Sequence, residues 1–106
     1  MNWLTGPAPA QPAGERFRAL LARGGLLTLP GAYNGLAALQ AREQGFEALY
    51  LSGAALSASM GLPDLGILTI DDVCHAIRQI TRSTALPLLV DGDTGYGGVH
   101  NIRQPI

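Results

Sequence analysis

The sequence predicts an α/β fold built around a parallel β-sheet, for two reasons. Short, continuous apolar runs alternate with stretches of helical periodicity, and glycine, proline and polar residues separate them. The apolar runs lack the polar alternation of half-exposed strands, as is typical of parallel strands with both faces covered. Hydrophobic residues make up 47% of the 106-residue chain, which is enough to form a buried core. Strands joined by helices in this way pair in parallel through right-handed crossovers.

The N-terminal segment predicts one helix after a flexible leader. Residues 1–14 are rich in proline and small residues, so they bury too little surface to become ordered. From Glu15 to Arg23, apolar residues recur at helical spacing, and Gly24-Gly25 ends the segment. We therefore expect a leader over 1–14 and a short amphipathic helix after it.

Three apolar runs predict strands, because each is too short for a helix. Leu26–Leu29 is ended by Pro30-Gly31, and Ala48–Leu51 closes at Ser52-Gly53. Pro87–Val90 runs into a polar, glycine-rich loop. The three runs are expected to be neighbouring strands of one sheet.

Two helices are expected to connect these strands. Ala32–Gln44 is rich in leucine and alanine, and Gly45 is a typical C-terminal cap. The second helix begins at a cap provided by Thr69 or Asp71 and ends near Arg82. Its apolar residues recur at helical spacing and form one buried stripe: Ile70, Val73, Ile77 and Ile80.

Three strands do not complete a parallel sheet. An open doubly wound sheet has about five or six strands and a barrel about eight. Asn101 could cap one more helix, but the 106 residues end within a turn of it. We therefore expect the last strand to have a bare side unless further residues cover it, and the chain to be part of a larger fold.

The composition argues against several classes of protein and partner. Seven basic residues, all arginine, and eight acidic residues give a net charge of −1, which provides no long-range attraction to nucleic acid or to an anionic membrane. No apolar run approaches the ~20 residues of a membrane-spanning helix, and the N-terminus lacks the features of a secretion signal. Cys74 is the single cysteine, so no internal disulfide can form. A cytoplasmic protein without nucleic acid or membrane partners is the default expectation.

The exit of the third predicted strand carries two carboxylates. Asp91 and Asp93 are two residues apart, so on an extended chain both side chains point to one face. They lie at the carboxyl end of the strand, where parallel α/β proteins place their sites. Two hard oxygen ligands suit Mg²⁺. The alternative is that the aspartates only cap the following turn; Tyr96, in the same loop, either closes over a ligand or pins the loop.

Two further groups follow the second predicted strand. Asp64 would lie over the same end of the sheet, where it could orient a water or a substrate proton, although Asp after Pro is also common in turns. Ser52 and Gly53 offer a hydroxyl and approachable backbone N–H groups, which suit a carboxylate or carbonyl oxygen. A strand that simply ends in a polar turn explains the Ser-Gly pair almost as well.

Three ordered segments carry a more specific signal: Tyr50–Gly53, Gly61–Gly66 and Leu88–Gly98. Together, within Pro30–Gly98, they resemble the isocitrate lyase and phosphoenolpyruvate mutase superfamily, and most closely its 2-methylisocitrate lyases. The resemblance implies a TIM-type (β/α)8 barrel, of which residues 15–106 would form an incomplete N-terminal part of about three βα units. It also implies an Mg²⁺-dependent lyase that cleaves 2-methylisocitrate, a small carboxylate, into pyruvate and succinate during propionate breakdown.

The resemblance also assigns roles to the candidate residues. Asp91 and Asp93 would hold the Mg²⁺ ion, and Asp64 would be catalytic, contacting the metal's waters or positioning a water. The substrate carboxylate would be bound by the end of the second strand and the residues after it: Tyr50, Ser52, Gly53 and Ala54, the last standing where a second Gly is frequent.

The superfamily carries its proton-donating Cys in a Cys-Gly-His loop after a later strand, and Cys74 does not match that loop. We therefore expect the chain to be the N-terminal part of a lyase that does not turn over substrate alone, and its full-length relatives to be homo-oligomers, as tetramers. The close alternatives are phosphoenolpyruvate mutase, carboxyphosphonoenolpyruvate phosphonomutase and oxaloacetate-acting enzymes. More distant alternatives are a non-catalytic fragment that pairs with a full-length subunit, and a small α/β binding domain.

Overall fold

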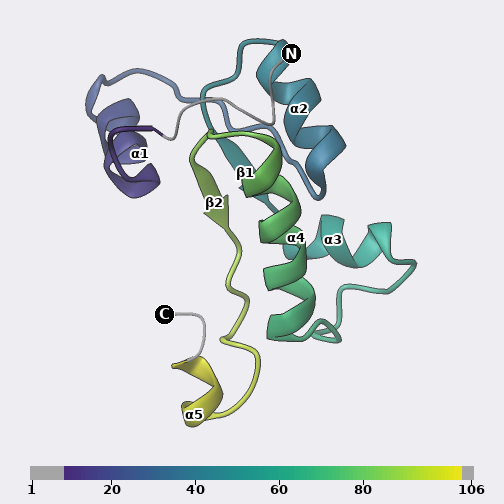
Figure 1. The fold of residues 1–106 in the computed structure, drawn as a ribbon. Coiled ribbons are helices and arrows are strands. Elements are labelled where there is room, and N and C mark those ends of the chain that lie inside the picture. The colour runs from purple at the N-terminus through teal and green to yellow at the C-terminus, as the bar shows by residue number, and fades with distance from the viewer. Residues whose placement is uncertain (1–8, 104–106) are drawn as a thin grey trace.

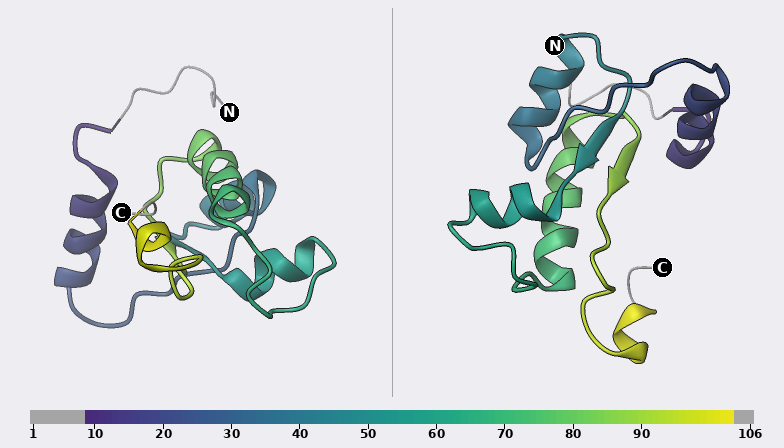
Figure 2. Two further views of the ribbon diagram at one scale, coloured as in Figure 1. Left: turned by 90° about the horizontal axis from the view of Figure 1, so that it is seen from below. Right: turned by 180° about the vertical axis from the view of Figure 1, so that it is seen from behind.

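The computed structural model describes residues 9–103 of the chain, and their elements alternate between helices and strands. In order they are α1 (Ala13–Ala22), α2 (Gly35–Glu43), β1 (Leu49–Leu51), α3 (Gly53–Ser59), α4 (Ile70–Ser83), β2 (Leu88–Val90) and α5 (Val99–Ile102). Helices α2, α3 and α4 lie on one side of the two strands, and α1 lies on the other side (Figures 1 and 2). The predicted α/β class is confirmed.

The sheet is a parallel pair, as predicted. β1 and β2 are in register from Leu49 opposite Leu88 to Leu51 opposite Val90. The chain between them passes through α3 and α4, so the connection is a helical crossover. The second and third predicted strands are therefore confirmed, each one residue shorter than expected.

The first predicted strand, Leu26–Leu29, is wrong. These residues have no strand structure, and the parallel contact in this region is a single bridge between Gly31 and Tyr50. Two hydrogen bonds form this bridge. The Ala32 N–H donates to the Tyr50 carbonyl at 2.9 Å, and the Tyr50 N–H donates to the Pro30 carbonyl at 3.0 Å. Proline has no N–H to donate, so Pro30 cannot extend the ladder from its own nitrogen. Leu26 is 94% exposed, and Leu27 and Leu29 are only half-buried, so none of the leucines in this segment is fully packed into the core.

Helix α4 has the start and the buried stripe that the sequence predicts. The Thr69 side chain accepts from the Asp72 N–H at 3.2 Å, and the Asp72 carboxylate accepts from the Thr69 N–H at 2.8 Å. This reciprocal pair is a capping box, which fixes Thr69 rather than Asp71 as the cap. Ile80 of the stripe is fully buried.

The other helices differ from the prediction mainly in where they begin. α1 starts at Ala13, two residues earlier than expected, and residues 1–8 of the predicted leader lie outside the described part of the chain. α2 starts at Gly35, because the Asn34 side chain accepts from the Ala37 N–H at 2.9 Å and caps it. α3 was not predicted, and α5 follows Gly98 instead of being capped by Asn101.

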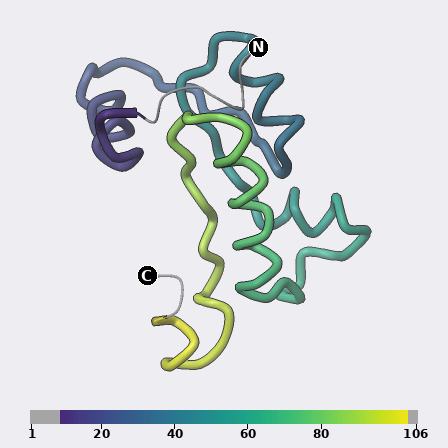
Figure 3. The backbone as a smooth tube through the Cα atoms, in the orientation of Figure 1, coloured from purple at the N-terminus to yellow at the C-terminus, as the bar shows by residue number. Residues whose placement is uncertain are grey.

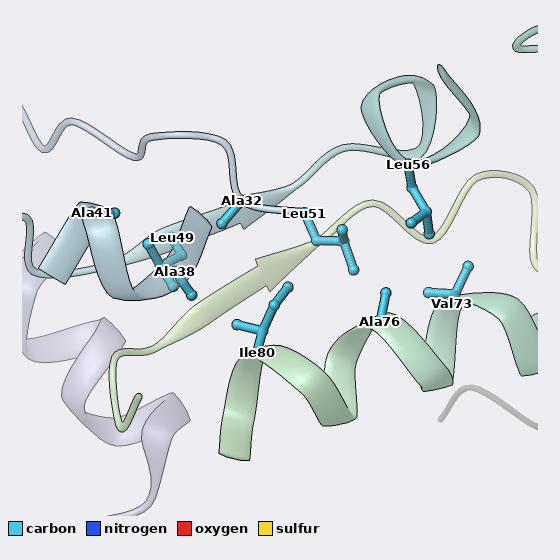
Figure 4. Packing of buried hydrophobic residues seen from close by; sticks show 9 residues of the cluster. All are labelled: Ala32, Ala38, Ala41, Leu49, Leu51, Leu56, Val73, Ala76 and Ile80. Carbon is cyan, nitrogen blue, oxygen red and sulfur yellow. The ribbon is translucent and has the colours of Figure 1, made fainter. Parts of the chain in front are cut away.

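The core lies between the strands and helices α2 and α4. Leu49 and Leu51 of β1 point toward α2 and α4, and Figure 4 shows Leu51 close to Ile80 and Ala76. Gly35 allows the two helices to approach, since a Cβ at this position would collide with the Ser83 hydroxyl. Because these side chains pack against the helices on one face of the sheet, the alternate residues of the strands point to the opposite face.

Candidate functional site

Strand alternation places the predicted site residues on the face opposite the helices. In β1, Leu49 and Leu51 are buried in the core, while Tyr50 between them is half-buried. In β2, Leu88 and Val90 pack against the core, while Leu89, the register partner of Tyr50, is 43% exposed. The parallel pairing continues past β2, because the Asp91 N–H donates to the Leu51 carbonyl at 3.0 Å. Ser52 and Asp91 therefore leave their strands on the same face and at the same end of the sheet.

Asp91 joins the ends of the two strands through its carboxylate. One oxygen, Oδ2, accepts from the Gly53 N–H at 3.3 Å, across 38 residues of sequence. The other, Oδ1, accepts from the Asp93 N–H at 2.9 Å. A built Cβ at Gly53 would lie 3.1 Å from Oδ2, so the absence of a side chain there allows this close approach. The structure thus brings together two predicted site residues, Asp91 and Gly53, at one point.

The start of α3 explains why Ser52 and Gly53 are where they are. The Ser52 hydroxyl oxygen accepts from the Ala55 N–H at 3.2 Å and caps the helix. Ser52 and Gly53 are half-buried, and Ala54 is exposed. Ser52-Gly53 was predicted to be the end of a strand, and the helix that begins there was not predicted. The missed signal was a Ser cap followed by the small, helix-compatible residues Ala54 and Ala55.

The loop after β2 leads to α5 at the C-terminal end of the described chain (Figure 3). Asp93 has a φ of 45° and Tyr96 a φ of 63°, both in the left-handed region, and Asp93 is exposed. The Tyr96 hydroxyl donates to the Asp91 backbone carbonyl at 2.9 Å. Tyr96 therefore pins the loop, which was one of the two alternatives predicted for it. Burial, together with the charges of Asp91 and Asp93, raises the pKa of the Tyr96 phenol, so the hydroxyl keeps its proton at neutral pH.

Asp64 does not join the other two carboxylates in this structure. It is exposed in a turn between α3 and α4, where the Leu65 N–H donates to the Pro63 carbonyl at 3.0 Å. Within residues 9–103, no three His, Cys, Asp or Glu side chains are grouped closely enough to hold a metal ion. The expected convergence of three carboxylates is therefore wrong as a description of this structure. The turn geometry that makes Asp common after Pro accounts for the position of Asp64.

The two remaining carboxylates still fit a magnesium ion by their chemistry. Asp91 presents oxygens that are already fixed by backbone N–H groups, and each carboxylate oxygen retains a further lone pair. Asp93 contributes a second carboxylate from the same exit loop. Mg²⁺ is bound by one or two carboxylates and completes its octahedron with water and substrate oxygens. The donor set is thus suitable in type and number.

A separate hollow with a volume of about 400 Å³ lies between α3, α4 and the residues just before α2. Its walls include Tyr33, Leu56, Met60, Asp71 and His75. Its lining contains none of the predicted site residues. We therefore assign the candidate site to the strand ends rather than to this hollow.

The profile of the phosphoenolpyruvate phosphomutase family matches residues 17–106. The chain belongs to this family. A 2-methylisocitrate lyase from Bacillus subtilis is 50% identical over 105 residues, which cover 98% of this chain and 35% of the relative. The chain thus spans about 35% of the length of this curated relative. The superfamily expected from the three sequence motifs is confirmed.

Solved structures of phosphoenolpyruvate mutase/isocitrate lyase proteins share the fold. A phosphonopyruvate hydrolase in complex with oxalate and Mg²⁺ is 36% identical with a TM-score of 0.79, covering 87% of this chain and 32% of that one. A 2,3-dimethylmalate lyase is 39% identical with a TM-score of 0.76, covering 89% and 32%. These family members act on small carboxylates. In the part of our chain that the structure describes, no helix is long and apolar enough to cross a bilayer.

Proposed function

We propose that the chain provides the metal-binding and carboxylate-binding part of an Mg²⁺-dependent carbon–carbon lyase that cleaves 2-methylisocitrate into pyruvate and succinate. The supporting observation is the contact between Asp91 and Gly53 at the ends of β2 and β1, in a chain 50% identical to a 2-methylisocitrate lyase. In this proposal the parallel pair and its helices are one part of a (β/α)8 barrel, and full-length proteins assemble as homo-oligomers. Propionate breakdown and a cytoplasmic location belong to the same proposal.

Asp91 and Asp93 are the proposed metal ligands. When bound there, Mg²⁺ supplies Lewis-acid stabilisation of negative charge on the oxygens of a 2-hydroxy acid. The carboxylate of Asp91 is already oriented by the N–H groups of Gly53 and Asp93, so little ordering is required of it. Asp93 is exposed in the same loop, so its carboxylate is accessible to a metal ion from solvent.

The proposed carboxylate-binding groups are at the start of α3. The Ser52 oxygen accepts a hydrogen bond from Ala55, which leaves its own proton free to donate to a substrate carboxylate. The N–H of Ala54 lies in the first helical turn, where it has no intrahelical acceptor. Tyr50, on the same face of the sheet, is proposed to line the pocket. Asp64 is proposed to position a water once substrate is bound.

Binding and turnover measurements on the purified 106-residue chain test this proposal. We expect Mg²⁺ to bind, and 2-methylisocitrate to bind more tightly when Mg²⁺ is present, in isothermal titration calorimetry. Ser52→Ala should weaken substrate binding without weakening Mg²⁺ binding. Because Ser52 also caps α3, the matched control is Thr69→Ala, which removes a comparable cap from α4 and should leave substrate affinity unchanged.

An affinity for 2-methylisocitrate that is the same with and without Mg²⁺ would contradict the proposed lyase site. The same solutions can be assayed for pyruvate release, where we expect none from this chain alone. Tighter binding of phosphonopyruvate or 2,3-dimethylmalate than of 2-methylisocitrate would instead favour a sister activity of the superfamily. The solved relatives with those activities make both compounds suitable competitors.

A non-catalytic role is the second candidate, and the open edge of β2 favours it. In the part of the chain that the structure describes, β2 pairs with β1 and with no other strand. An unpaired strand edge is a ready partner for another chain. Co-purification of the tagged 106-residue chain with a full-length lyase subunit would support this role, and failure to co-purify would argue against it.

A further inference from the structure

Tyr96 lies five residues after Asp91, and the two residues are directly bonded. The Tyr96 hydroxyl donates to the backbone carbonyl of Asp91 at 2.9 Å, and the ring packs against the core cluster. Neither contact is required by the roles given above to the metal ligands or to the carboxylate-binding groups. The position of Tyr96 therefore needs its own explanation.

The loop that contains Asp93 depends on such contacts for its shape. Asp93 and Tyr96 are both in the left-handed region without being glycine, a backbone conformation that L residues adopt at an energetic cost. Two backbone N–H groups form hydrogen bonds inside the loop. The Asp93 N–H donates to Asp91 Oδ1 at 2.9 Å, and the Gly95 N–H donates to the Gly92 carbonyl at 3.0 Å. Left-handed residues persist only where surrounding contacts hold them.

The Tyr96 hydroxyl bonds to the backbone carbonyl oxygen of Asp91, the one polar atom of Asp91 that the contacts already described do not involve. The N–H of Asp91 is held by Leu51, and its two carboxylate oxygens are held by Gly53 and Asp93. Tyr96 holds the carbonyl oxygen. Fixing this oxygen fixes the peptide plane after Asp91, and hence the direction in which the chain leaves toward Asp93.

We propose that Tyr96 is a positioning residue for the Asp91–Asp93 pair. By holding the Asp91 carbonyl, it sets the orientation of the two carboxylates relative to each other before a divalent cation binds. This inference rests on the proposed function in one respect, because it assumes that Asp91 and Asp93 are the metal ligands. Tyr96 itself touches neither metal nor substrate in this assignment.

The test compares Tyr96→Phe with Ser59→Ala in the full 106-residue chain. Both substitutions remove one hydroxyl that donates to a backbone carbonyl, since the Ser59 hydroxyl donates to Leu56 at 2.6 Å on α3. Tyr96→Phe should weaken Mg²⁺ binding about two- to tenfold in calorimetric titration, the range that follows from the loss of one neutral hydrogen bond. Ser59→Ala should leave Mg²⁺ affinity unchanged within about twofold, although it loses a bond of the same kind.

A second measurement does not depend on the metal. Hydrogen exchange followed by NMR should be several-fold faster at the Asp93 amide in Tyr96→Phe than in wild type or Ser59→Ala. Wild-type Mg²⁺ affinity in Tyr96→Phe, or an unchanged Asp93 exchange rate, overturns the inference and leaves the proposed function intact. Failure of the wild-type chain itself to bind Mg²⁺ overturns the metal site and this inference together, so the two failures are distinguishable.

Discussion

Asp91 and Asp93 carry equal charge but differ in what they contact, and this difference can be measured as folding stability. Asp91 accepts two backbone N–H bonds, from Gly53 at 3.3 Å and from Asp93 at 2.9 Å. None of the side-chain hydrogen bonds found within residues 9–103 involves the Asp93 carboxylate, which is exposed. We therefore expect Asp91→Asn to destabilise the fold and Asp93→Asn to leave its stability nearly unchanged.

The size of the difference follows from the geometry at Asp91. An Asn side chain has one acceptor oxygen instead of two, so it can retain the 2.9 Å bond to the Asp93 N–H but loses the longer bond to Gly53. Losing a bond to a charged acceptor and leaving the Gly53 N–H without a partner costs about 1–2 kcal/mol. Asn is well tolerated at the left-handed φ of position 93, so Asp93→Asn should change stability by less than about 0.5 kcal/mol. Relief of repulsion between the two carboxylates is common to both variants and cancels in the comparison.

Urea unfolding followed by circular dichroism, with and without MgCl₂, measures both effects. Without Mg²⁺, Asp91→Asn should unfold at lower urea than Asp93→Asn. With Mg²⁺ at ten times its Kd, the wild-type chain should gain about 1.4 kcal/mol, and both variants should lose most of this gain. Equal stability of the two variants without Mg²⁺ would refute the placement of Asp91 against the start of α3. A full Mg²⁺ effect in Asp93→Asn would refute its role as a ligand.

Three further predictions concern the scaffold. Ile80→Ala should cost about 2–5 kcal/mol in urea unfolding because Ile80 is fully buried, while Ile67→Ala, at a residue that is 48% exposed, should cost less than about 1 kcal/mol. Thr69→Ala should cost about 1 kcal/mol through loss of the α4 cap; an unchanged midpoint would contradict the capping box. Hydrogen bonds from the backbone N–H and hydroxyl of Thr69 hold the pKa of Asp72 below its ordinary 3.8, so its stabilising effect is fully present above that pH and is lost on acidification through the lower folded-state pKa. In Asp72→Asn the free energy of unfolding should therefore fall less steeply as the pH decreases below about 4. The same acid dependence in the variant and the wild type would contradict this prediction.

The elements that the sequence predicted well are those whose signals are local. Thr69 and Asp72 make a capping box within four residues, and the stripe through Ile80 recurs on one helical face. The runs ending at Leu51 and Val90 are short and apolar, and both form strands. In each case neighbouring residues contain the information that decides the structure.

The elements that were missed depend on partners distant in sequence. Leu26–Leu29 has the composition of a strand, but pairing with β1 falls at Gly31 instead, and this register is not encoded within the segment. α3 consists mostly of small residues, so it has little apolar periodicity, and Ser52, its cap, was predicted to be the end of a strand. Composition alone could not distinguish these outcomes.

The same distinction applies to the site. The bond from the Asp93 N–H to Asp91 is the turn-capping alternative that the sequence offered for these aspartates, and it lies within three residues. The bond from Gly53 to Asp91 spans 38 residues and depends on the register of two strands. The link from Tyr96 to Asp91 is short in sequence, but it requires two non-glycine residues in the left-handed region, which no pattern in the sequence indicates. Sequence thus identified the candidate ligands but not all the contacts that hold them.

Asp64 shows what decides whether a third carboxylate can join such a pair. The turn that contains Asp64 is linked to the end of α3 by a hydrogen bond from the Leu62 N–H to the Ser57 carbonyl at 2.9 Å. Leu65, the residue after Asp64, is however 77% exposed. A segment with so little buried apolar surface is not held over the site by packing, so its position depends on what else it contacts. Asp91 is the opposite case, because four of its atoms are bonded to neighbours on β1, α3 and its own loop. A proposed role for Asp64 therefore requires bound substrate to bring the turn inward, whereas the Asp91 carboxylate is oriented without it.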